Sequence, residues 1–243
     1  MSMTRFPLGL ALLVLLSLLV YLGVLHRVLD RLRLNDRAAL AVLAAMILGS
    51  FIDLPLPVAG VTATVNVGGG LVPLGLAGYL IWRAGTPLER WRGILAGAAT
   101  ALAGYAVGSL LMRGLVEPGG RFQWLDALYV YPVAAGAVAY LVGRSRRAAC
   151  VGAVLGVILF DVFYLVWLKL SGVAGVVAIG GAGALDAVVL SAVLAVILAE
   201  VVGETRERLA GGPALVGRPQ KLLVNLRRPE VRRGEGYRDG TPQ

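Results

Sequence analysis

Residues 148–168 read AACVGAVLGVILFDVFYLVWL, an apolar stretch with a single charged residue, Asp161. A membrane-spanning helix needs about 20 consecutive apolar residues, and this stretch supplies them. The whole chain has the same character: of its 243 residues 58% are hydrophobic and 15% are charged, and the mean hydropathy is +0.80. Soluble domains carry about 25% charged residues. The sequence therefore predicts an integral protein of the inner (plasma) membrane.

Seven stretches of this kind predict an all-α bundle of seven transmembrane helices over residues 1–202. They cover residues 6–25, 38–57, 63–82, 91–112, 124–143, 148–168 and 182–202. The first stretch is long for the core of a signal peptide. The residues after it, His26-Arg27-Val28, offer no small-residue cleavage site, so we expect it to remain as a helix.

The lysines and arginines predict the orientation of this bundle. Most of them follow the first, third, fifth and seventh stretches, whereas the segments on the opposite side carry few: Arg5, Arg113, Arg121 and Lys169. Cytoplasmic loops are enriched in Lys and Arg. The N-terminus is therefore expected outside and the C-terminus in the cytoplasm.

Residues 203–243 form a second, basic region. They mix basic and acidic residues with Gly and Pro and show no sustained apolar period, which predicts a largely disordered cytoplasmic tail. The chain carries a net charge of +9, but Tyr237 is the one aromatic residue of the tail on which a base would stack. We therefore expect the lipid bilayer and not nucleic acid as the partner, and a homo-oligomer stays open.

Two glycine-rich runs interrupt the apolar pattern, at residues 66–70 (NVGGG) and 180–183 (GGAG). Consecutive glycines disfavour a helix, and irregular backbone is tolerated at membrane depth where it faces a cavity. We therefore expect broken helices near residues 66–70 and 172–183, with a short re-entrant or interfacial piece before Gly180. Neither run is followed by the Lys-Ser/Thr pair of a nucleotide-binding loop.

The surroundings of the two runs resemble each other. Residues 51–53 (FID) precede the first run, and residues 160–161 (FD) precede the second. Paired broken helices in corresponding positions are typical of transporters. The repeat therefore favours a binding or transport function.

Four aspartates lie in or near the apolar stretches: Asp53, Asp126, Asp161 and Asp186. An aspartate deep in a membrane helix costs about 2.5–3.5 kcal/mol on insertion scales, so such residues mark candidate sites. Asp53 and Asp126 lie close to predicted helix ends, where water reaches them. Asp161 and Asp186 lie inside the last two stretches at similar depth, so we expect them to meet in the outer half of the membrane.

The predicted site combines acids, an amide and glycines: Asp161, Asp186, Asp53, Asn66, Gly68, Gly69, Gly180 and Gly181. It suits a proton, a cation or a small polar solute, which predicts a transporter-like protein. Oxygen ligands suit Ca²⁺ or Mg²⁺, so metal binding stays open. No cofactor is expected, because the chain has one histidine and one cysteine. A structural or accessory subunit, whose acids only hydrogen-bond between helices, is an alternative.

Residues 66–74 (NVGGGLVPL) together with residues 180–186 (GGAGALD) resemble an uncharacterised prokaryotic family of multi-pass membrane proteins, domain of unknown function 1614. The resemblance covers nearly the whole membrane part and excludes the tail. It implies a multi-pass helical fold, and it brings no established activity.

Residues 160–161 (FD) and 181–186 (GAGALD) resemble, more distantly, motifs of intramembrane aspartyl proteases of the presenilin type. In that family one aspartate follows an aromatic residue, and a second closes a Gly-x-Gly-Asp motif on the next helix. Here Ala184 and Leu185 are inserted before the second acid. The resemblance implies that Asp161 and Asp186 share a proton, one acting as the acid and the other as the base that activates water.

Overall fold

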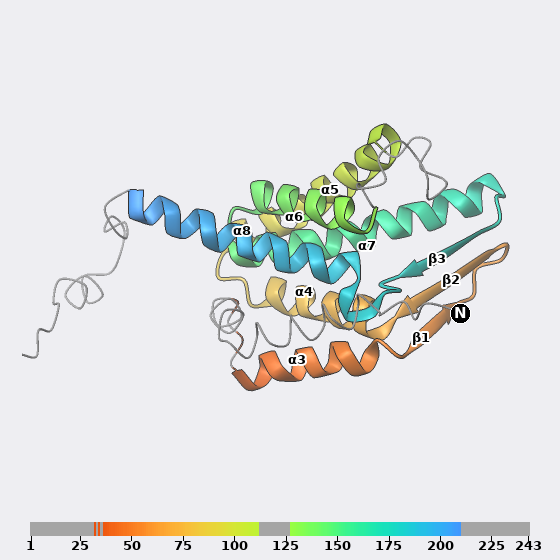
Figure 1. Cartoon of the computed structure of the whole chain (residues 1–243), viewed down its shortest axis with the longest axis horizontal. Coiled ribbons are helices and arrows are strands. Elements are labelled where there is room, and N and C mark those ends of the chain that lie inside the picture. The colour runs from red at the N-terminus through yellow and green to blue at the C-terminus, as the bar shows by residue number, and fades with distance from the viewer. Residues whose placement is uncertain (1–31, 33, 35, 112–126, 210–243) are drawn as a thin grey trace, which may run out of the picture. The chain divides into compact units, whose positions relative to one another are not determined.

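The computed structural model describes residues 32, 34, 36–111 and 127–209, and this part of the chain is mostly helical (Figure 1). Six α-helices account for most of it: α3 (Asp36–Gly49), α4 (Val72–Trp82), α5 (Pro87–Ala106), α6 (Ala127–Gly143), α7 (Arg146–Ser171) and α8 (Ala187–Leu209). Each falls on one of the last six predicted stretches. The first stretch, residues 6–25, lies outside the described residues, as does Asp126.

Three short strands correct the all-α prediction for the segments between these helices. Strands β1 (Asp53–Leu56) and β2 (Val61–Asn66) form an antiparallel hairpin, and β3 (Gly175–Ile179) pairs with β2 in parallel. Figure 1 shows β2 between the other two strands. Prolines at 55 and 57 prevent a helix in β1, and the β-branched residues of β2 fit an extended strand. The predicted helices over residues 38–57 and 63–82 are therefore shorter than expected.

The first glycine run is helical, which differs from the expected unwound backbone. Residues Val67–Leu71 form a π-helical turn, η1, that continues directly into α4. The side chain of Asn66 caps this turn by accepting a hydrogen bond from the Gly69 backbone N–H. The helix break therefore lies before the glycines, at the end of β2.

The second glycine run does interrupt the chain as expected. Strand β3 ends at Ile179, and Gly180 and Gly183 adopt positive φ values of 69° and 63°. Both angles lie in the left-handed region that favours glycine. A single 3₁₀ turn, η3 (Gly183–Leu185), then leads to α8. The short piece expected before Gly180 is thus an extended strand.

The two runs occupy corresponding places in the fold. Strand β2 leads through η1 into α4, and strand β3 leads through η3 into α8. Because β2 and β3 run parallel and side by side, the two strand–turn–helix units have the same direction at the sheet. This arrangement agrees with the repeat seen in the sequence.

Small residues bring α5 and α7 into close contact. A Cβ atom on Gly152 would lie 2.4 Å from the Cβ of Ala96, and one on Gly156 would lie 2.3 Å from the Cβ of Thr100. Such spacing lets helix backbones approach closely. Contacts at Gly93, beside Val151, and at Gly104, beside Phe160, show that the two helices run parallel.

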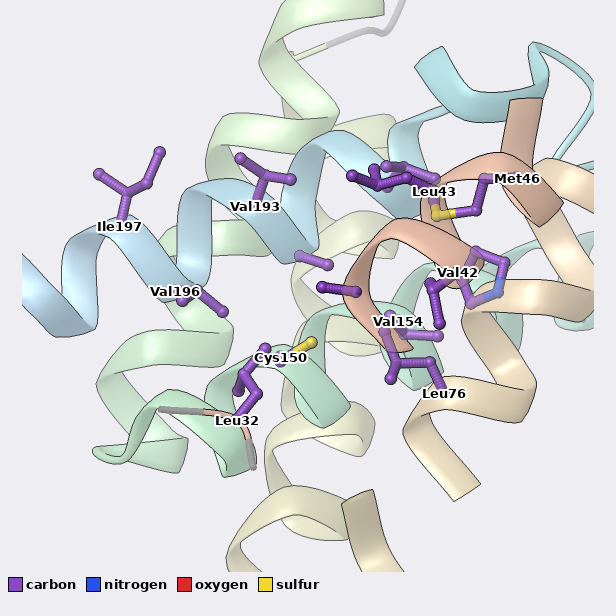
Figure 2. Close-up of a pocket in the computed structure, with 14 residues that line it drawn as sticks. Leu32, Val42, Leu43, Met46, Leu76, Cys150, Val154, Val193, Val196 and Ile197 are labelled. Atoms are coloured by element: carbon purple, nitrogen blue, oxygen red, sulfur yellow. The ribbon is translucent and has the colours of Figure 1, made fainter. Parts of the chain in front are cut away.

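The largest apolar cluster lies among α4, α6, α7 and α8. Beside it is a cavity of about 80 Å³, shown in Figure 2, which no charged side chain lines among the described residues. Its lining comes from α3, α4, α7, α8 and Leu32: Leu32, Ala39, Val42, Leu43, Met46, Pro73, Leu76, Cys150, Val154, Val189, Ala192, Val193, Val196 and Ile197. This small cavity offers nothing to hold a polar ligand.

Two of the described helices are long and apolar enough to cross a membrane, Arg146–Ser171 and Ala187–Arg206. Shorter apolar helices cover Arg37–Gly49, Val67–Trp82 and Val130–Gly143. Large apolar side chains also remain exposed, for example Phe51 at 84% and Leu102 at 69%. These features indicate a membrane protein. Helix α8 continues to Leu209, past the predicted end at residue 202 and into the predicted tail.

Candidate functional site

Glycines from three separate segments meet where α3 ends, η1 begins and the chain turns from β3 towards α8. We call Gly49, Gly68, Gly69, Gly180 and Gly183 the glycine crossing. A Cβ atom on Gly69 would lie 2.3 Å from the carbonyl oxygen of Gly180, and one on Gly180 would lie 2.3 Å from the backbone nitrogen of Gly70. The backbones therefore touch directly, and no side chain fits between them.

The end of α3 closes the crossing from the other side. A Cβ atom on Gly68 would lie 2.0 Å from the carbonyl oxygen of Met46, and one on Gly183 would lie 2.4 Å from the Oγ of Ser50. Glycine is required at these positions because backbone or a short side chain occupies the space. The crossing thus packs α3, η1 and η3 together.

Asn66 is the buried polar centre of this region, with 1% of its surface exposed. Its Nδ2 donates to the carbonyl oxygen of Ser50 at 3.0 Å and to Oδ1 of Asp53 at 2.9 Å, and its Oδ1 accepts from the Gly69 N–H at 2.9 Å. The strand pairing places Asn66 opposite Asp53. The side-chain amide of Asn66 therefore connects the C-terminal end of α3 and the start of β1 to η1.

Ser50 links the two glycine runs, and the predicted site did not include it. Its hydroxyl donates to the carbonyl oxygen of Met46 at 2.6 Å and accepts from the Ala184 N–H at 2.8 Å. The second bond joins residues far apart in the sequence. A serine at the end of an apolar stretch is a weak signal for such a bond, because the neighbouring sequence does not show which distant backbone N–H it binds.

Asp186 caps the start of α8, which corrects its predicted place inside a helix. Its Oδ1 accepts from the Val188 N–H at 3.0 Å, and its Oδ2 accepts from the Ala182 N–H at 3.2 Å. Its backbone carbonyl accepts the first bonds of the helix, from Val189 and Leu190. A carboxylate is favoured at this position because free N–H groups and the positive end of the helix dipole meet there. The glycines before it delay the start of the helix.

Asp161 lies within α7, and the structure describes no hydrogen bond or ion pair for it among the placed residues. Helical spacing puts it on the same face as Val157, Leu165 and Leu168, which are buried. Leu165 and Leu168 pack with residues of β2 and β3. The Asp161 carboxylate lies within electrostatic range of Asp186. Among the described residues no hydrogen bond joins the two acids.

The structure brings together most of the predicted site residues. Asp53, Asn66, Gly68, Gly69 and Gly180 all belong to the crossing or its hydrogen bonds. Gly181 lies beside the crossing, where a Cβ would be 2.6 Å from the Cβ of Ala178. Within the described ranges, no group of three or more His, Cys, Asp or Glu residues is arranged to hold a metal ion.

The described part of the chain is a helical protein with two helices long and apolar enough to cross a membrane, and its glycine-rich segments meet at one end of these helices. Residues 25–198 match the model of a family described as "Protein of unknown function (DUF1614)", and the chain belongs to this family. The resemblance seen in the sequence is thereby confirmed, whereas nothing supports the resemblance to presenilin-type proteases. Comparisons with curated proteins and with solved structures gave no match.

Proposed function

We propose that this protein is a multi-pass protein of the inner membrane that binds a proton or a small cation at Asp161, beside Asp186, and has a transporter-like activity. The observation that carries the proposal is the environment of Asp161. It is a half-buried carboxyl on the buried face of an apolar helix, without a hydrogen-bond partner among the described residues. An unpaired carboxylate at such a position costs about 2.5–3.5 kcal/mol, and a bound proton or cation removes that cost.

The second carboxylate strengthens this preference for positive charge. Asp186 is held in place by two backbone N–H groups, and it lies within electrostatic range of Asp161. Two nearby carboxylates repel each other when both are ionised. A single positive charge shared between them, as a proton or a cation, relieves the repulsion.

The distribution of arginines supports an extracytoplasmic position for this site. In the described part of residues 1–202, arginines lie at the helix ends remote from the sheet: Arg37, Arg83, Arg90, Arg92, Arg144, Arg146 and Arg147. The sheet end carries Lys169. Because basic residues favour the cytoplasmic side, the sheet and the glycine crossing face outward. We retain the proposal of seven spans with the N-terminus outside.

The paired strand–turn–helix units support transport, because broken helices in repeated positions surround the substrate sites of many transporters. The crossing itself is packed backbone against backbone and fixed by Asn66 and Ser50. We therefore assign it the role of a rigid support that positions Asp186. The substrate reaches Asp161 from the extracytoplasmic side.

The test is ion flux in proteoliposomes that contain a trapped pH-sensitive dye, with Na⁺, K⁺, Ca²⁺ and Mg²⁺ gradients measured separately. Asp161→Asn, which keeps the shape and loses the charge, should abolish the flux seen with the unmodified protein. Glu204→Gln is the control, because Glu204 is an exposed carboxylate near the other end of α8. Unchanged flux in a well-folded Asp161→Asn protein would refute the proposal.

A structural or accessory role is the second candidate, and the capping of α8 by Asp186 favours it. In that case the unmodified protein carries no flux, and Asp161→Asn changes stability only slightly. The protease alternative requires a free second carboxylate, whereas both oxygens of Asp186 accept backbone N–H groups. Incubation of the reconstituted protein with membrane-spanning peptides, followed by mass spectrometry, tests it directly.

A further inference from the structure

A groove between α5, α6 and α7 has a volume of about 890 Å³, and neither Asp161 nor Asp186 belongs to its lining. We call it the aromatic groove. Residues of α5, the following π-helical turn η2 (Val107–Leu111), α6 and α7 line it: Ala98, Ala101, Leu102, Tyr105, Gly108, Ser109, Tyr131, Leu159, Phe160, Phe163, Tyr164 and Trp167. Its volume falls in the range of about 300–1,000 Å³ that small-molecule sites occupy.

The chemistry of the lining changes along the groove. Because α5 and α7 run parallel, Ala98, Leu102 and Leu159 lie towards one end and Ser109, Tyr164 and Trp167 towards the other. From Ala98 to Ser109 the groove follows its helices over about 16 Å, at 1.5 Å per residue. The hydroxyl end lies towards the sheet, because α7 leads into β3, and the apolar end lies farther from it.

Three tyrosine hydroxyls line the groove. Tyr105, Tyr131 and Tyr164 make no hydrogen bond through their hydroxyls within the described residues. The rings are held by contacts: the Tyr131 and Phe160 centroids lie 5.6 Å apart, and those of Tyr164 and Trp167 lie 6.0 Å apart in a stacked pair. Gly108 leaves the Tyr131 hydroxyl accessible, since a Cβ there would lie 2.9 Å from it.

The mouth of the groove is apolar and open. Leu102, Tyr105 and Phe163 are 69%, 66% and 63% exposed, and no charged residue belongs to the lining that the structure describes. Phe163 and Trp167 belong to α7, one of the two helices long and apolar enough to cross the membrane. If α7 crosses the membrane, this mouth faces lipid, and an uncharged apolar chain is the ligand that matches its lining.

We propose that the aromatic groove binds one acyl chain of a membrane phospholipid. The chain lies along the apolar end, and the ester oxygens of the same lipid accept hydrogen bonds from the tyrosine hydroxyls. Tyrosine and tryptophan favour this position at a membrane interface because one side of each ring is apolar and the other end is polar. The site is a lipid-binding function separate from the proposed ion binding.

The test is quenching of Trp167 fluorescence by phosphatidylcholine that carries bromine on its acyl chains close to the ester groups. Trp82, Trp91 and Trp124 are replaced by phenylalanine, and the purified protein is titrated in detergent micelles. The reference protein keeps Trp82 alone, which is 74% exposed and lies outside the groove. Quenching of Trp167 should saturate at a mole fraction of brominated lipid about tenfold lower than that of Trp82. Parallel quenching curves would overturn the proposal and show ordinary boundary lipid.

Filling the groove gives a matched test. With Ala98→Leu, half-maximal quenching of Trp167 should require the same mole fraction of brominated lipid as it does for the Trp82 reference. Because Ala98 is exposed, the larger side chain should not prevent folding. Ala45→Leu makes the same change on an exposed position of α3 and should have no effect. No shift with Ala98→Leu contradicts the site.

Removing a hydroxyl tests the placement of the ester group. Tyr131→Phe or Tyr164→Phe should weaken binding of the brominated phospholipid about two- to tenfold, as expected for one hydrogen bond. Tyr140→Phe, in α6 but outside the groove, should leave it unchanged. A brominated fatty acid that binds as tightly as the phospholipid would overturn the assignment to a phospholipid.

Discussion

The backbone of Gly69 lies directly against that of Gly180, so that a Cβ atom on Gly69 would approach the Gly180 carbonyl oxygen to 2.3 Å. The contact joins the turn after β2 to the turn after β3. It therefore holds the starts of α4 and α8 next to each other, and with them the carboxylate of Asp186.

Gly69→Ala should destabilise the protein by several kcal/mol, because the added methyl group meets backbone that cannot move aside. Gly75→Ala is the matched control. Gly75 lies in α4 with nothing within 4 Å of a Cβ, so alanine there should stabilise the helix by about 0.5–1 kcal/mol. Thermal unfolding in detergent compares the two. Equal melting temperatures would contradict the close contact.

Asn66→Ala should cost about 2–4 kcal/mol, because it removes a buried amide and leaves the Gly69 N–H without its acceptor. Thr62→Ala, an exposed position in the same strand, should change stability by less than about 0.5 kcal/mol. Hydrogen exchange should show faster exchange of the Gly69 amide in the Asn66 variant. Unaltered exchange there would argue against the hydrogen bond.

The positions of the six described helices were largely predictable from the sequence, because long apolar stretches favour helices. The strands were not predicted. Residues 61–66 and 175–179 are short, apolar and rich in β-branched side chains, and such runs read equally well as ends of a membrane helix. Pro55 and Pro57 were the local signal for β1, since they disfavour a helix in the residues before them.

The sequence predicted most residues of the candidate site, but it did not predict which of them contact each other. Glycine runs marked the breaks, but the contact between Gly69 and Gly180 depends on the pairing of distant strands. Asp186 was placed inside a helix because the start of α8 is set by the turn at Gly180 and Gly183, which the apolar pattern does not reveal. The hydrogen bond between Ser50 and the distant Ala184 N–H was not predicted for the same reason.

Substitutions at Asp186 should separate its capping role from its charge. Asp186→Ala should lower stability by about 0.5–2 kcal/mol, the usual cost of losing an N-cap, and Asp186→Ser should recover most of that loss. Asp186→Asn keeps the cap and removes the charge, so it should fold normally and bind cations or protons more weakly. The measurements are thermal unfolding and flux in proteoliposomes. Normal flux with Asn would show that the charge of Asp186 is not used.

Cysteine labelling should establish the orientation. Ala59→Cys, in the loop between β1 and β2, should react in intact cells with a membrane-impermeant maleimide. Arg90→Cys, in the first turns of α5, should react only after the membrane is permeabilised. The native Cys150 is buried and should give little background. The reverse labelling pattern would invert the proposed topology.

The parallel pairing of β2 with β3 has a consequence for synthesis of the protein. Strand β2 leaves the ribosome long before β3, so its outer edge carries unpaired amides and carbonyls while the intervening helices are still being made. An open strand edge readily recruits another chain. Nascent chains that stall after α4 and before β3 should therefore tend to pair with one another through this edge. Once β3 is made, it pairs with β2 and covers the edge.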